Sequence, residues 1–214
     1  CDYNYVFDPN VHLKRFFGEG AGGDYIFLID EAHNLVERGR EMYSASICRE
    51  SLIKVRKKIR EKMPAVYRSV GRVKRMLDEL QKECGDYKVL PGTGSITMGL
   101  LKIQGGFESY LEEHKDAELE EDVRQLYFDV RNFVNMAEYV DENYVVYAEN
   151  GSDGAFRLKL FCVNPAANLG EYLKKGRSTV FFSATLLPMD YYRKLLSCRT
   201  DDYGIYVRSP FEQE

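Results

Sequence analysis

Residues 25–29 form an apolar run, Tyr-Ile-Phe-Leu-Ile, that leads directly into Asp30-Glu31-Ala32-His33. The run is rich in aromatic and branched side chains and too short for a helix, which predicts a strand buried on both faces. Carboxylates that follow such a strand lie where open α/β sheets bind their ligands. An α/β fold with a site at Asp30 and Glu31 is therefore expected.

Two adjacent carboxylates at the end of a buried strand form the Walker B arrangement of nucleotide hydrolases. In that arrangement one carboxylate holds Mg²⁺, usually through water, and its neighbour polarises the attacking water. On this interpretation Asp30 is the metal residue and Glu31 is the general base. The alternative is a strand that simply ends in a solvated acidic turn.

A second apolar run, residues 178–182, ends in Ser183-Ala184-Thr185. It predicts another strand that is followed by small hydroxyl residues. The two runs are interpreted as strands of one sheet that a long insertion separates.

Together these segments resemble a known family. Asp30-Glu31-Ala32-His33 and Ser183-Ala184-Thr185 resemble motifs II and III of superfamily-2 helicases. The surrounding segments are similar to those of XPD/DinG-like DNA helicases: Asp2-Tyr3-Asn4-Tyr5-Val6-Phe7-Asp8-Pro9, Asn164-Pro165-Ala166 and Ser209-Pro210-Phe211. The resemblance covers both ends of the chain and hardly any of its middle.

The resemblance implies an ATP-dependent DNA helicase with 5′-to-3′ polarity that couples Mg-ATP hydrolysis to translocation along single-stranded DNA or at DNA forks, and a role in DNA repair. It also implies that His33, Ser183 and Thr185 couple the nucleotide state to the grip on DNA. His33 and Glu37 could instead form a metal pair on a helix, but two ligands without a third are a weak signal.

Two expected motifs are absent from the 214 residues. No Gly-Lys-Ser/Thr turn is present to grip phosphates, and no arginine-rich motif VI occurs. Residues 91–95, Pro-Gly-Thr-Gly-Ser, lack the lysine and a preceding strand, and they are interpreted as a flexible turn. The chain is therefore expected to be a helicase fragment that is inactive by itself. The alternative is a non-catalytic module that binds nucleic acid or protein.

The predicted fold is an incomplete RecA-like motor domain with parallel strands, interrupted by a mainly α-helical insertion. The resemblance implies that this insertion is the arch domain, which spans the DNA path. The expected divisions are residues 1–44 (motor domain 1), 45–143 (insertion), 144–208 (a hairpin and the return to motor domain 1) and 209–214 (start of motor domain 2).

The insertion begins with a basic segment. Residues 49–75 hold eleven basic and two acidic residues in a chain whose net charge is −4. Apolar residues recur at helical spacing and predict an amphipathic helix that is broken before Pro64. Arg56, Lys57 and Arg60 are candidate DNA contacts, and Tyr67 could stack on a base. The alternative is a solvated helix face that docks onto the acidic helix predicted from Leu119 to Ala137.

Composition agrees with a globular intracellular protein. Hydrophobic residues make up 44% and charged residues 30% of the chain. No run of 18 apolar residues and no signal-like N-terminus is present, so a cytoplasmic protein without a membrane segment is expected. The five cysteines are widely spaced and contain no C-x-x-C pair. Relatives often hold an iron–sulfur cluster, but this sequence assigns no ligands to one.

Overall fold

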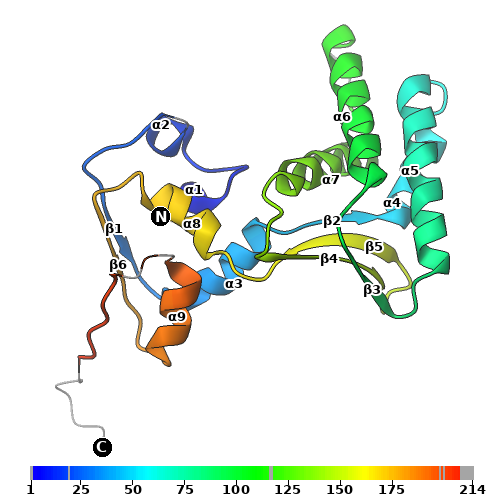
Figure 1. The fold of residues 1–214 in the computed structure, drawn as a ribbon. Helices are drawn as coiled ribbons and strands as arrows, with labels where there is room; N and C mark the ends of the chain where they lie inside the picture. Colours follow the sequence, from blue (N-terminus) through cyan, green and yellow to red (C-terminus); the bar gives the residue numbers. More distant parts are fainter. Residues whose placement is uncertain (1, 19, 116–117, 198, 200, 208–214) are drawn as a thin grey trace, which may run out of the picture. The chain divides into compact units, whose positions relative to one another are not determined.

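The computed structural model describes residues 2–207 apart from 19, 116–117, 198 and 200. The described chain divides into two compact units (Figure 1). Unit 1 takes its residues from 1–42 and 164–214, and unit 2 comprises residues 43–163. The segment 209–214, expected to begin a second motor domain, lies outside the described residues, as does Ser209-Pro210-Phe211.

Unit 1 is built around two parallel strands. Its elements are α1 (Asn4–Phe7), α2 (Lys14–Phe17), β1 (Ile26–Ile29), α3 (His33–Met42), α8 (Ala166–Leu173), β6 (Ser178–Phe181) and α9 (Met189–Leu196). Strand β1 pairs with β6 in parallel, with Ile26 opposite Ser178 and Ile29 opposite Phe181. The expected pairing of the two apolar runs in one parallel sheet is confirmed, and the fold is α/β.

The expectation that the first strand is buried on both faces is wrong for the described chain. Phe27 and Ile29 are buried, whereas Ile26 is 62% and Leu28 is 70% exposed. Side chains alternate across a strand, so one face of β1 packs on the core of unit 1 and the other faces solvent.

Unit 2 combines an antiparallel sheet with helices. Its elements are β2 (Ala45–Cys48), α4 (Arg49–Lys58), α5 (Pro64–Lys82), β3 (Tyr87–Leu90), α6 (Ser95–Glu113), α7 (Glu121–Ala137), β4 (Tyr144–Asn150) and β5 (Phe156–Cys162). The four strands are ordered β2-β5-β4-β3, and each neighbouring pair is antiparallel.

The helices of unit 2 gather on one face of this sheet (Figure 1). Val146, Ala148, Leu158 and Leu160 alternate with less buried residues along β4 and β5, and they form the sheet's share of the core. Helices α4, α5 and α7 contact the sheet, and α6 packs on α5 and α7. The core of unit 2 thus lies between one sheet face and a layer of helices.

The predicted helices and hairpin are confirmed, including the break before Pro64, which is the first residue of α5. Strands β2 and β3 were not predicted. Each spans four residues, too few to show a clear alternation against the neighbouring helical patterns. Residues 91–95, expected to follow no strand, in fact come directly after β3, and Ser95 is the first residue of α6. The lysine of a phosphate-binding turn is still absent from this segment.

The placement of the hairpin needs correction. It was expected to return the chain to unit 1 from residue 144, but β4 and β5 are the two central strands of the unit 2 sheet. The boundary between the units falls after residue 163. The physical reason is the pairing of β5 with β2 and of β4 with β3, since sheet pairing joins segments that no local pattern connects.

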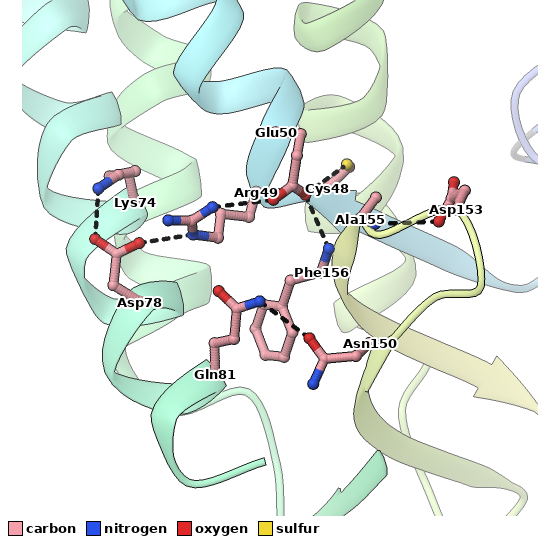
Figure 2. A network of polar contacts seen from close by, with 10 residues as sticks. All are labelled: Cys48, Arg49, Glu50, Lys74, Asp78, Gln81, Asn150, Asp153, Ala155 and Phe156. Atoms are coloured by element: carbon pink, nitrogen blue, oxygen red, sulfur yellow. Dashed lines mark hydrogen bonds and ion pairs between the residues drawn. The ribbon is translucent and has the colours of Figure 1, made fainter. Parts of the chain in front are cut away.

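A polar network ties the start of α4 to α5 and to the β4–β5 turn (Figure 2). The Glu50 carboxylate accepts a hydrogen bond from the backbone N–H of Phe156 at 2.8 Å. Arg49 donates to Glu50 at 3.0 Å and to Asp78 at 2.7 Å, and Lys74 donates to Asp78 at 2.6 Å. Burial opposes ionisation of Asp78, but the hydrogen bonds from Lys74 and Arg49 outweigh it and lower its pKa.

This lowered pKa predicts a pH-dependent contribution to stability. A carboxyl group whose pKa is lower in the folded state stabilises the fold above its unfolded pKa of about 4, and this contribution is lost as pH falls through the folded value. Asp78→Asn should therefore lower the unfolding free energy by roughly 1 kcal/mol at pH 7 and by progressively less below pH 4.

Urea denaturation of the two proteins from pH 7 to pH 3 measures this difference. Glu79→Gln is the matched control, because Glu79 is the exposed neighbour of Asp78. A constant gap between wild type and Asp78→Asn across this range would contradict the prediction.

Candidate functional site

The carboxyl ends of β1 and β6 meet at one edge of their sheet. Beyond the paired strands, the N–H of Phe182 donates to the carbonyl of Ile29 at 3.0 Å, and the N–H of Ala32 donates to the carbonyl of Phe182 at 3.2 Å. These bonds extend the alignment past the ends of the strands. Residues 30–33 and 183–185 therefore lie side by side, although long stretches of chain separate them.

Ser183 is the centre of the resulting cluster. Its hydroxyl donates to the Glu31 carboxylate at 3.0 Å, and its oxygen lies 2.8 Å from Nδ1 of His33. The oxygen also lies 3.2 Å from the Thr185 hydroxyl and accepts the Thr185 backbone N–H at 3.2 Å. Four of the five predicted motor residues are thus in direct contact through one hydroxyl group.

This network constrains the protonation of His33. A serine hydroxyl has one proton, so when Ser183 donates to Glu31 it can only accept from His33. Nδ1 of His33 must then carry a hydrogen. The distance of 3.2 Å between Nδ1 and the Glu31 carboxylate agrees, because the same N–H faces both oxygen atoms.

Asp30, the fifth predicted residue, is adjacent but oriented differently. Its carboxylate accepts the backbone N–H of Glu31 at 2.8 Å and is exposed. The Glu31 side chain is 56% exposed. Both carboxylates are therefore accessible to a ligand from solvent.

The backbone at Glu31 is unusual. Its φ is +47°, and it is the one non-glycine residue with a positive φ among those described. Residues other than glycine rarely adopt this left-handed backbone conformation, and such strained positions cluster at functional sites.

A contact to this strained residue was missed by the sequence analysis. The Tyr3 hydroxyl shares its one hydrogen between two backbone carbonyls, that of Asp30 at 2.5 Å and that of Glu31 at 3.1 Å. Burial and the nearby charges of Asp30, Glu31 and Asp2 raise the pKa of Tyr3, so its hydroxyl remains a donor at neutral pH. In the sequence, Tyr3 belongs to a segment marked only by its family resemblance, and no local pattern indicates this contact.

The donor set at this edge suits magnesium–nucleotide better than a closed metal site. Mg²⁺ keeps several waters and takes one or two carboxylates together with substrate phosphates. The exposed carboxylate of Asp30 could be one of these ligands. Among the described residues, no group of three or more His, Cys, Asp or Glu side chains could hold a metal ion. The His33–Glu37 alternative is disfavoured, since Arg40 donates to Glu37 at 2.5 Å and His33 contacts Ser183.

The three candidate DNA contacts of the basic segment differ in accessibility. Lys57 and Arg60 are exposed. The guanidinium of Arg56 instead lies 4.2 Å from the ring centre of Tyr67, and its Nε is buried without a hydrogen-bond partner. Arg56 thus occupies one ring face of Tyr67, the candidate side chain for base stacking.

Other cations of this segment form ion pairs within unit 2. Lys54 and Lys58 donate to Asp122 at 2.5 and 2.6 Å, and Lys58 also lies 3.0 Å from Glu120. Docking onto the acidic helix therefore accounts for part of the basic segment. Further exposed cations pair with no carboxylate in the part of the chain that the structure describes, namely Lys57, Arg60, Lys62, Arg68, Arg72 and Arg75.

Comparison with known proteins supports the fold. No protein-family model and no curated protein sequence matches this chain. Among solved structures, Xpd4 from S. tokodaii superposes with a TM-score of 0.52 at 17% sequence identity. The match covers 86% of this chain and 39% of that chain. The chain therefore has a fold similar to that of Xpd4 over most of its length, and it spans well under half of the neighbour's length.

Among the described helices, none is long and apolar enough to cross a lipid bilayer.

Proposed function

We propose that this chain is part of an ATP-dependent DNA helicase motor that couples Mg-ATP hydrolysis to movement along single-stranded DNA. The observation that carries the proposal is the Ser183 hydroxyl, which contacts both Glu31 and His33. This hydroxyl, which follows β6, contacts the Glu31 carboxylate, which follows β1 and is suited to water activation. The XPD-like fold supports the same reading.

Each residue has a distinct role in this proposal. Glu31 accepts a proton from the attacking water, and Asp30 orients the magnesium ion, which neutralises phosphate charge when bound. His33, Ser183 and Thr185 transmit the state of the nucleotide site to the part that grips DNA. The 5′-to-3′ polarity rests on the family resemblance alone.

The test is steady-state ATP hydrolysis by the complete gene product, with and without single-stranded DNA. We expect hydrolysis that single-stranded DNA stimulates. The 214 residues alone should show no turnover, because they contain no Gly-Lys-Ser/Thr turn to hold the phosphates. No hydrolysis by the complete gene product, with DNA present, would refute the motor.

A second candidate function, nucleic-acid binding by unit 2 without catalysis, is favoured by the exposed cations of α4 and α5. Arg68 and Arg72 lie one helical turn apart on α5 and can neutralise neighbouring phosphates. Such contacts release counterions and give salt-dependent attraction with little sequence preference.

Removing these two cations should weaken binding of single-stranded DNA. For the double variant Arg68→Ala with Arg72→Ala, the slope of log affinity against log salt should shrink by up to about 1.4, since each single-strand phosphate contact contributes about 0.7. Fluorescence anisotropy with a labelled oligonucleotide at several salt concentrations measures this slope. Lys54→Ala is the control, because Lys54 already pairs with Asp122. An unchanged slope in the double variant would show that Arg68 and Arg72 do not contact the DNA phosphates.

A further inference from the structure

Tyr3 connects the segment before α1 to the acidic residues that follow β1. Its hydroxyl lies 2.5 Å from the carbonyl oxygen of Asp30 and 3.1 Å from that of Glu31. These residues are 27 and 28 positions away in sequence. The contact therefore joins two separate parts of unit 1.

The two carbonyl groups that Tyr3 contacts belong to the two peptide units on either side of the Glu31 Cα atom. The orientation of the first unit relative to that atom is set by φ of Glu31, and that of the second by ψ. A hydroxyl group that contacts both carbonyls therefore restrains both dihedral angles of one residue. That residue is the one whose φ is +47°.

The backbone conformation of Glu31 decides where its side chain points. The carboxylate reaches Ser183 at 3.0 Å and His33 at 3.2 Å from this left-handed backbone. If φ returned to the common negative range, the Cα–Cβ bond would turn away and these contacts could not persist. The Ala32 N–H bond to Phe182 holds the chain after Glu31 but does not restrain the Asp30 carbonyl.

We propose that Tyr3 is a positioning residue for Glu31: its hydroxyl holds the left-handed turn that aims the Glu31 carboxylate at Ser183 and His33. Tyr3 touches no reacting atom and acts only through the backbone of Asp30 and Glu31. The kinetic consequence rests on the proposed function, because it assumes that Glu31 activates water. The effect of Tyr3 on the backbone conformation of Glu31 does not depend on that assumption.

The kinetic test compares Tyr3→Phe with Tyr5→Phe in the complete gene product. Both substitutions remove one hydroxyl and keep the ring, and Tyr5 is 48% exposed on α1. Tyr3→Phe should lower kcat for ATP hydrolysis roughly tenfold, because small misplacements of a reacting group are costly. KM for ATP should stay within about twofold and the melting temperature should not change, since phosphate binding and the core do not involve this hydroxyl. Tyr5→Phe should behave as wild type.

A second readout does not depend on turnover. The backbone amide and Cα chemical shifts of Asp30, Glu31 and Ala32 should move in Tyr3→Phe and stay in place in Tyr5→Phe. Unchanged shifts, or a loss of kcat matched by equal losses in ATP affinity and melting temperature, would overturn the positioning role. If the wild type hydrolyses no ATP, the proposed motor fails, and the chemical shifts still decide whether Tyr3 holds the turn.

Discussion

Replacing Glu31 by glutamine is expected to lower ATP hydrolysis by the complete gene product about 10²–10⁴-fold, the usual contribution of a general base. Glutamine keeps a side-chain oxygen that can accept the Ser183 hydroxyl, but it cannot take a proton from water. The loss should therefore appear in kcat, with KM for ATP little changed. Steady-state kinetics with saturating single-stranded DNA measures it.

Glu37→Gln is the matched control for this substitution. Glu37 lies on α3, six residues after Glu31, where it pairs with Arg40 and its side chain is 70% exposed. The same chemical change there should leave hydrolysis within about twofold, as for a surface position away from the site. Equal losses in both variants would show a general effect of removing negative charge rather than a catalytic role for Glu31.

Replacing Gly99 by alanine is expected to destabilise unit 2 through the contact between α5 and α6. A Cβ atom at Gly99 would lie 2.5 Å from Cγ2 of Val73, and one at Gly106 would lie 2.8 Å from Cγ2 of Val66. The two glycines and the two valines are each seven residues apart, so they line one contact along both helices. Valine is stiff at χ1 and cannot move aside easily.

The magnitude follows from two opposed terms. Overpacking of a core costs about 1–3 kcal/mol, whereas alanine in place of glycine inside a helix returns at most about 1 kcal/mol. The unfolding free energy should therefore fall by up to about 2 kcal/mol, which urea denaturation of this chain resolves.

Gly105→Ala, in the same helix, should instead raise the unfolding free energy. Nothing lies within 4 Å of a Cβ atom at Gly105. The helix-propensity gain of about 0.5–1 kcal/mol should then appear without an overpacking cost. Stabilisation by both substitutions would show that α5 and α6 do not approach each other closely at Gly99.

Local patterns in the sequence predicted much of the secondary structure. The helical spacing of Val66, Val70, Val73 and Leu77 indicated α5, and Pro64 marked its first residue. Alternation on either side of Asn150-Gly151 indicated the β4–β5 hairpin. These signals survive because helix and hairpin contacts form between residues that are close in sequence.

The candidate site could be predicted in its residue types but not in its contacts. The apolar run that ends in two carboxylates pointed to Asp30 and Glu31, and the resemblance to helicase motifs II and III implied His33, Ser183 and Thr185. The roles of these residues in hydrolysis and coupling remain predictions. The accessibility of the basic segment could not be predicted, since charge alone does not distinguish Lys54, which pairs with Asp122, from exposed Lys57.

The sequence by itself determined the periodic elements, the two polar strand ends and the excess of positive charge in residues 49–75. Only the tertiary structure decided that the hairpin belongs to unit 2, that one face of β1 is exposed and that the Tyr3 hydroxyl contacts the carbonyls of Asp30 and Glu31. Ser183 and His33 meet across 150 residues of sequence. Such contacts depend on which distant segments pair and pack, and no short-range periodicity contains that information.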